Sequence, residues 1–467
     1  MLTLGIILCY LLGLTVLLAI SRKYSLAELI GYSYLIGMGL ETFILFLLDV
    51  VGVHYSQGLL IGVNLAAILA ISGINYKGLM QLKDEFKMPS VSLKDINLVA
   101  VAIFCLAAYL FYAISVKNLF WPPSAHDAIG SFDKLGKIMA LEGKLKISLF
   151  QYELEGAGGL YPPLFHGSFA YMYIFGALLP KISITLFFLS LLTTFYAILR
   201  KYVDATAAML ITYLMMITPE MFSHAALALG NMPTTAYVSA AALATFVWLD
   251  KRDVKYFWLG AVTMAFVIWI RSDTIVFTAA ALLIMGIDFL RTKDFKKLLA
   301  YSVIAVAPFI IWMLYLKLSI HANQAARFDL GMGYNAERMG VVSTYVKSFL
   351  FAGSHGRIDG GQLYGIVFIV FALVLLINLA LIFVAGAKTI LTDKMYALLF
   401  FFGSFFLYFL VFYLIDEKAQ RAPIASLMES SFKRGLFCFV PLAWFYVATS
   451  YGPAWLFNKI ERFRVGE

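Results

Sequence analysis

Long apolar runs, joined by short polar connectors, follow one another along nearly the whole chain. A helix that crosses a bilayer needs about 20 apolar residues, and such windows recur often enough to predict roughly 12–14 membrane helices. Only 13% of the residues are charged, whereas soluble domains carry about 25%. We therefore expect an all-α integral membrane protein, a polytopic helical bundle with short loops on its outer face.

Basic residues predict the side of the membrane for each connector, because Lys and Arg collect on cytoplasmic loops. Arg22 and Lys23 lie in the first connector, and later connectors carry further basic groups. These connectors are expected inside, which places the loops 117–162, 319–363 and 416–434 outside. The predicted spans lie at about 2–20, 29–51, 59–74, 96–116, 232–249, 256–270, 274–290, 298–318, 364–387, 395–415 and 435–456, with three further stretches in the middle.

Those three middle stretches, 164–179, 183–199 and 203–217, make the number of crossings odd. If all three crossed, the turn that follows them would be inside, against the charge of the later connectors. We predict that one of the three is short, is re-entrant or lies along the surface. The sequence leaves open which one.

Composition also narrows the range of partners. The net charge is +9, but the basic residues are scattered through short loops and form no stripe, so no nucleic-acid partner is expected. Cys9, Cys105 and Cys438 lie in apolar segments at unrelated spacings. Such spacing indicates neither a disulfide framework nor a cysteine-based metal site. The lipid bilayer is the one partner that composition alone implies.

The loop 117–162 is the longest polar run in the N-terminal half and holds the first candidates for chemistry. Asp127 precedes a helix-like run, so it is either a helix N-cap, for which Asp is favoured, or a functional acid at the membrane surface. Asp133 would share one side of a helix with it. The alternatives are a solvated helix face for Asp133 and a solvated loop position for His126.

These residues resemble motifs of the GT-C superfamily, membrane glycosyltransferases that use lipid-phosphate sugars, and most of all its protein mannosyltransferase and aminoarabinose transferase branch. The resemblance spans residues 110–290. It is carried by Asp127, the run 133–143, Tyr161-Pro162-Pro163-Leu164 and the turn Leu229-Gly230-Asn231-Met232-Pro233. It implies a GT-C-type bundle with a catalytic core at 96–318, additional N-terminal spans at 1–95 and C-terminal spans at 319–467.

For such an enzyme, the resemblance implies that Asp127 is the general base. It would take a proton from the acceptor hydroxyl as that hydroxyl attacks the anomeric carbon of the donor sugar. His126 would orient this base or contact a phosphate, and Asp133 would support it from the following helix.

The second acid that the resemblance leads us to expect is Asn231 in this chain. Glu220 and His224 are the nearest ionisable residues in the same turn, and an ordinary helix-end position is the alternative for Glu220. Two carboxylates would hold a divalent cation, whereas Asn supplies only a neutral oxygen. The cofactor therefore stays open between a divalent cation bound with the help of Asp127 and none.

Several basic residues on the expected outer side run against the usual charge bias, and three of them are candidates for a phosphate site. Arg271 and Arg434 lie at predicted span ends, and Lys433 adjoins Arg434. A leaving lipid phosphate needs cationic hydrogen-bond donors, so these residues are the predicted phosphate site. The alternative is that their side chains snorkel to lipid headgroups.

We thus expect a glycosyltransferase of a prokaryotic inner membrane, with its site at the outer face. It would move a sugar from a polyprenyl-phosphate donor to a hydroxyl of a glycan, lipid or protein acceptor. The alternatives are a transporter or flippase of lipid-linked glycans and a glycan ligase that uses a lipid-diphosphate donor. Many transporters show internal repeats, and this chain shows none of fixed period.

Overall fold

A computed structural model describes residues 1–75, 97–125, 127–146, 161–320, 329, 331–351, 364–392, 394–417 and 422–454. Within these ranges the elements are helices joined by turns, without a strand. The helices are α1 (Leu2–Ile20), α2 (Leu26–Val50), α3 (Gln57–Ile74), α5 (Leu98–Phe120), α6 (Asp133–Glu142), α7 (Leu164–Ile174), α8 (Ile182–Leu199), α9 (Ala205–Met216), α10 (Pro219–His224), α11 (Asn231–Lys251), α12 (Val254–Ile270), α13 (Ile275–Thr292), α14 (Phe295–Tyr315), α15 (Ala336–Phe351), α16 (Val367–Ala380), α17 (Ile382–Ala385), α18 (Ala387–Thr392), α19 (Met395–Tyr413), α21 (Ile424–Leu427), α22 (Lys433–Gly435) and α23 (Phe439–Thr449).

Eleven helices in the described ranges are long and apolar enough to cross a bilayer. The expectation of an all-α integral membrane protein is confirmed at this level. The described spans fall short of 12–14 because α9 and α12 are apolar but shorter, and α7 has only 11 residues. At a rise of 1.5 Å per residue, an 11-residue helix such as α7 covers only about 17 Å of a hydrocarbon core about 30 Å thick.

The central helix of the bundle is α11, whose residues from Asn231 through Leu249 are all buried. It runs from one end of the bundle to the other, and α12 packs against it and returns in the opposite direction. The first residue of α11, Asn231, therefore lies at the same end as Arg271, which follows α12. We call this the site end.

Basic connectors gather at the other end, which we call the basic end. Lys251 donates a hydrogen bond to the carbonyl of Lys201 at 3.1 Å, and Lys255 donates one to the carbonyl of Lys23. Lys394 pairs with Asp250 at 3.3 Å. The described connectors at Lys23, Lys251, Lys255 and Lys394 thus share one end of the bundle, as the charge bias predicted, while Asn231 and Arg271 lie at the opposite end.

The helix α7 resolves the odd count of crossings. Just before it, the Tyr161 ring lies 5.3 Å from the Arg271 guanidinium at the site end. Near its last residue, Tyr173 donates a 2.6 Å hydrogen bond to the Asp133 carboxylate of α6, so both ends of α7 lie at the site end. The next helix, α8, begins at the same end, because Lys181 donates to the carbonyl of Trp121 just beyond α5 at 3.1 Å. Gly176, with φ of 85°, lies in the turn between α7 and α8. Of the three middle stretches, the first therefore does not cross.

The other two middle stretches cross once each: α8 crosses to the basic end, and α9 with α10 returns. Asn97, before α5, bonds to Thr206 at the start of α9 at 2.8 Å, and Asn118, near the other end of α5, bonds to Ala225 after α10 at 2.8 Å. Together α9 and α10 thus run the length of α5. This arrangement brings the turn before Asn231 back to the site end. The basic connectors later in the chain had predicted the same placement.

The N-terminal spans belong to the same packed bundle. Tyr32 of α2 donates a hydrogen bond to the carbonyl of Ala240 in α11 at 3.0 Å, and Tyr237 of α11 donates one to the carbonyl of Leu35 at 2.6 Å. All four residues are buried. These bonds fix α2 directly against the helix that carries Asn231.

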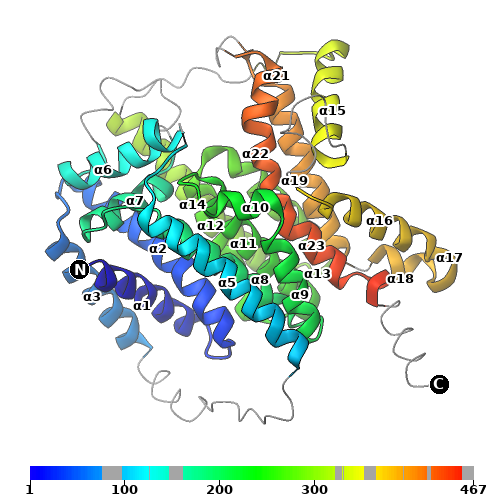
Figure 1. Cartoon of the computed structure of the whole chain (residues 1–467), viewed down its shortest axis with the longest axis horizontal. Coiled ribbons are helices and arrows are strands. Elements are labelled where there is room, and N and C mark those ends of the chain that lie inside the picture. Colours follow the sequence, from blue (N-terminus) through cyan, green and yellow to red (C-terminus); the bar gives the residue numbers. More distant parts are fainter. Residues whose placement is uncertain are drawn as a thin grey trace.

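The loops at the site end are more helical than expected. Figure 1 shows α6, α15 and α21 along the upper side of the molecule, above the ends of the long helices. The predicted loop 319–363 contains α15. In the predicted loop 416–434, a helix begins after Pro423 and continues through short π and 3₁₀ turns into α23, which ends at Thr449. Proline is tolerated just before a helix, and no later proline interrupts this one before Pro441.

Candidate functional site

Asp127 lies in the turn that links α5 to α6. The Trp121-Pro122-Pro123 sequence ends α5, with Trp121 in the extended conformation that a following proline demands. A single π turn, Ala128–Phe132, then leads into α6. Asp127 occupies the N-cap position of this turn, but its side chain makes no capping hydrogen bond.

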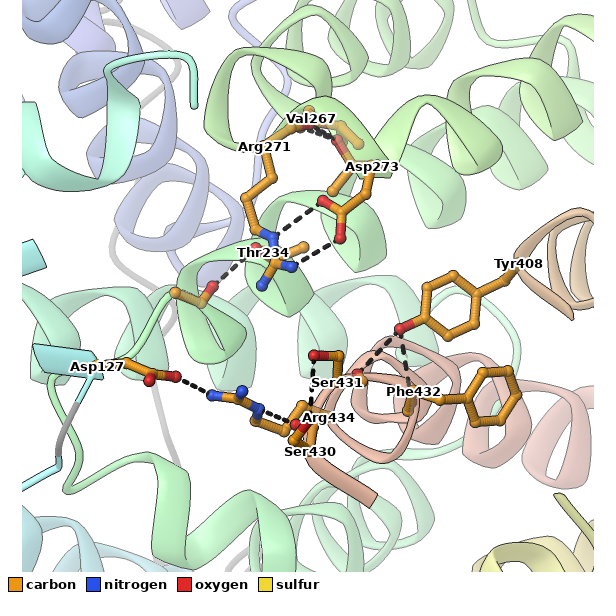
Figure 2. Close-up of polar contacts among 12 residues, drawn as sticks. Asp127, Thr234, Val267, Arg271, Asp273, Tyr408, Ser430, Ser431, Phe432 and Arg434 are labelled. Atoms are coloured by element: carbon orange, nitrogen blue, oxygen red, sulfur yellow. Dashed lines mark hydrogen bonds and ion pairs between the residues drawn. The ribbon is translucent and has the colours of Figure 1, made fainter. Parts of the chain in front are cut away.

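The Asp127 carboxylate instead pairs with Arg434. The Nη1 group of Arg434 donates to Oδ2 of Asp127, and Nε donates to the carbonyl of Ser430 one turn earlier in the same helix. The two partners of the ion pair are 307 positions apart in the chain. Figure 2 shows Arg434 reaching from its helix toward Asp127. Tertiary packing thus joins the predicted base to one of the predicted phosphate ligands.

Arg271 is held by a tight turn between α12 and α13. Its backbone is extended, and a 3₁₀ turn, Ser272–Thr274, follows at once. The Thr274 hydroxyl donates to the carbonyls of Val267 and Arg271, both at 2.6 Å, and closes the turn. Asp273 then accepts two hydrogen bonds from the Arg271 guanidinium, at 2.9 and 2.6 Å.

The surroundings of Arg271 keep its guanidinium protonated, as the direction of its pKa shows. Burial acts to lower the pKa, but the Asp273 carboxylate and the nearby Tyr161 more than offset it, so the pKa lies above its usual range. The guanidinium also lies over the Tyr161 ring, 5.3 Å from its centre. Arginine has five N–H groups, and Asp273 uses two of them.

One small cavity collects residues that the sequence had suggested separately. Arg271, Arg434 and Asn231 all line it. The other lining residues are Thr234, Asp273, Thr274, Phe277, Tyr408, Gly435 and Cys438. The volume open to the centre of a water molecule is about 20 Å³, enough for a single water. A sugar or a phosphate would therefore have to displace side chains, and the half-buried Asp127–Arg434 pair is the nearest candidate to move.

Gly435 allows Tyr408 to approach the cavity closely. A Cβ atom at Gly435 would lie 1.8 Å from the Tyr408 hydroxyl oxygen, so no side chain fits there without displacing the phenol. Tyr408 is buried and donates to the carbonyl of Ser431 at 3.2 Å (Figure 2). Sequence reasoning missed Tyr408, because nothing distinguishes it from its many aromatic neighbours in α19.

Asn231 is connected to a buried acid. Its side-chain amide nitrogen lies 3.1 Å from Nδ1 of His224, and Nε2 of His224 lies 3.0 Å from the Glu220 carboxylate. An amide nitrogen only donates, so Nδ1 accepts and Nε2–H donates to Glu220. All three residues are buried. The resemblance leads us to expect an acid at position 231. This chain has Asn231 there instead, and the His224 imidazole links it to the Glu220 carboxylate.

The remaining predicted residues lie apart from the cavity. Asp133 accepts from Tyr173 and so fastens α6 to α7. Lys433 is not among the lining residues, although its carbonyl accepts a hydrogen bond from Tyr364. His126 lies outside the described residues. The structure thus brings Asp127, Arg271, Arg434 and Asn231 into one region at the site end.

The donor set does not favour a tightly held metal. Asp127 and Asp273 each pair with an arginine, and the amide nitrogen of Asn231 faces His224. In the described part of the chain, no three His, Cys, Asp or Glu side chains group as metal ligands. A divalent cation would have to displace at least one arginine, so we derive no step through a metal.

No family model, curated protein or solved structure matches the chain.

Proposed function

We propose that this protein is a GT-C-type glycosyltransferase that uses a polyprenyl-phosphate sugar donor, with its active site at the site end of the bundle. One observation carries the proposal. Asp127 and Arg434, which are expected to be the base and a phosphate ligand, are in contact beside a cavity lined by Arg271 and Asn231. An acid and two cations at the end of an apolar bundle suit a reaction between a lipid-borne phosphate and a hydroxyl.

In this proposal Arg434 has two alternative partners. Without donor it pairs with Asp127. The donor phosphate competes for the same guanidinium, because charge-assisted hydrogen bonds to phosphate and carboxylate are similar in strength. Binding of the donor then releases the Asp127 carboxylate to act as a base. The pair thus links donor binding to the availability of the catalytic group.

The chemical step follows from these roles. The acceptor hydroxyl gives its proton to Asp127 while its oxygen bonds to the anomeric carbon, from the face opposite the phosphate. The bond between that carbon and the phosphate oxygen breaks, and its electron pair leaves with polyprenyl phosphate. Arg434 and Arg271 stabilise the added negative charge. The sugar is transferred with inversion.

Transfer assays with two variants test the proposal by separating kcat from KM. Asp127→Asn cannot accept the proton, so kcat should fall by about 10²–10⁴-fold, as is typical for loss of a general base. Arg434→Gln removes a charge-assisted contact that contributes about 1.5–3 kcal/mol. It should raise the KM for the donor by roughly one to two decades. The measurement is transfer of labelled sugar from polyprenyl phosphate, in membranes that supply acceptors.

A matched control is Glu429→Gln, which changes an acid at the same end that bonds to Tyr345 and does not line the cavity. It should leave kcat and KM near the wild-type values. Normal transfer by Asp127→Asn would contradict the proposal. Movement of intact donor across the membrane without cleavage would favour a flippase, and transfer only from lipid diphosphates would favour a ligase.

A further inference from the structure

A second cavity with charged walls lies at the basic end, between α2 and α8, far from the cavity at Arg434. The two helices touch at Gly31, where an added Cβ would lie 2.5 Å from Thr194 and 2.9 Å from the carbonyl of Ser190. Toward the basic end they diverge and leave a groove of about 540 Å³. We define the α2–α8 groove by its lining residues, Ser25, Leu26, Ala27, Ile30, Thr193, Tyr196, Ala197, Arg200 and Lys201.

The walls of the α2–α8 groove combine two kinds of chemistry. Its length is lined by aliphatic and aromatic side chains, and Leu26 is 66% exposed. Its mouth carries the consecutive cations Arg200 and Lys201. Arg200 is exposed and donates one hydrogen bond, from Nη1 to the carbonyl of Val203 at 2.8 Å. A narrow apolar slot with cations at its mouth suits an acyl chain attached to an anionic headgroup.

The acid nearest the mouth is already engaged. Glu28 completes the capping box at the start of α2 and also accepts from Tyr256. Lys201 lies 3.1 Å from its carboxylate. The N-terminal amides of α2 are likewise capped by Ser25 and Glu28, so the helix end itself offers little to an anion. The attraction for a headgroup comes from Arg200, supported by Lys201 and by the surrounding basic end.

We propose that the α2–α8 groove binds one anionic phospholipid of the membrane leaflet at the basic end. Its phosphate contacts Arg200 and Lys201, and one acyl chain lies along Leu26, Ile30 and Tyr196. Basic pockets between membrane helices attract anionic headgroups, at about 1 kcal/mol for each nearby Lys or Arg. The bound lipid would brace α2 against α8. This inference does not depend on the proposed glycosyl transfer.

Intact-protein mass spectrometry of the purified full chain, titrated with phosphatidylglycerol or phosphatidylcholine of identical acyl chains, tests this site. The wild type should bind phosphatidylglycerol more tightly, by roughly fivefold or more for each cation engaged. Arg200→Gln should remove roughly fivefold of that preference. The matched control is Lys296→Gln, the same charge change at an exposed position outside the groove, and it should leave the preference unchanged.

A second variant separates the groove from charge in general. Ala27→Trp fills the slot without changing any charge, and it should lower binding of both lipids while thermal unfolding in detergent still shows a folded protein. Equal binding of the two lipids by the wild type would overturn the proposal. So would equal losses in Arg200→Gln and Lys296→Gln, because the preference would then reflect net charge rather than this groove.

Discussion

At the scale of single residues, buried or half-buried charges mark the places where this bundle departs from a plain apolar core. Lys181 is one such charge; it lies directly before α8 and does not line the cavity at Arg434. Burial, with help from the nearby Lys117, lowers the pKa of Lys181 to about 8. The unfolded chain therefore binds more protons at this residue than the folded protein does between about pH 8 and pH 10.4.

Stability contributed by Lys181 should accordingly rise with pH through that window. Lys181→Met removes the charge, so it should raise the unfolding temperature most at pH 7 and progressively less toward pH 10. Thermal unfolding in detergent at several pH values measures this difference. Lys296→Met, at an exposed position, should shift the unfolding temperature equally at each pH. A difference for Lys181→Met that does not vary with pH would contradict the lowered pKa.

At the scale of elements, close helix contacts depend on glycine. α1 and α2 cross where a Cβ at Gly37 would lie 1.9 Å from the carbonyl of Cys9, and a Cβ at Gly13 would lie 1.9 Å from the carbonyl of Ser33. Helices in membranes pack through such small residues, because lipid supplies no hydrophobic drive for their association. The contact is between backbones, so neither side can yield by rotating a side chain.

Gly37→Ala should therefore lower stability by about 1–3 kcal/mol, the usual cost of overpacking. Gly62→Ala is the matched control, since nothing lies within 4 Å of a Cβ at this position in α3. It should be neutral or stabilising by up to about 1 kcal/mol, because alanine favours the helix. The measurement is the unfolding midpoint of both variants in one detergent. Equal midpoints would argue against the tight α1–α2 crossing.

At the scale of the whole molecule, charge separates the two ends of the bundle. The basic end holds Lys23, Lys251 and Lys255, while Asp127 and Asn231 lie at the site end. Because α11 has 21 residues, the ends are about 30 Å apart along it. We expect the basic end to be cytoplasmic and the site end to face outward.

Accessibility of introduced cysteines tests this orientation in a background where Cys105, the exposed native cysteine, is replaced by serine. A membrane-impermeant thiol reagent should label Ser131→Cys in intact cells, and Lys296→Cys only after permeabilisation. The reverse pattern would invert the bundle and place the site on the cytoplasmic side. Labelling of both positions in intact cells would contradict a separation of the two ends by the bilayer.

The sequence by itself determined the class of this protein and the ends of most spans. Apolar runs of about 20 residues leave a helical bundle in lipid as the stable arrangement, because backbone groups find no water there. Basic connectors such as Lys23 and Lys251 also predicted which helix ends share a side. Local sequence likewise identified Asp127 in the first outer loop, and Arg271 and Arg434 at outer span ends, where basic residues run against the usual charge bias.

Only the tertiary structure decided how these charges are used. Arg434 pairs with Asp127 across 307 positions, and Asn231 connects to Glu220 through His224. Neither contact has a local signal, since side chains from different helices meet only when the bundle packs. The sequence also could not show that α7 is the stretch that does not cross. Apolar residues indicate that a segment prefers lipid, but they do not indicate whether it crosses the bilayer. Helix packing brings Arg271 and Arg434, which are far apart in the sequence, to the wall of one cavity. Only contacts between distant parts of the chain can do this.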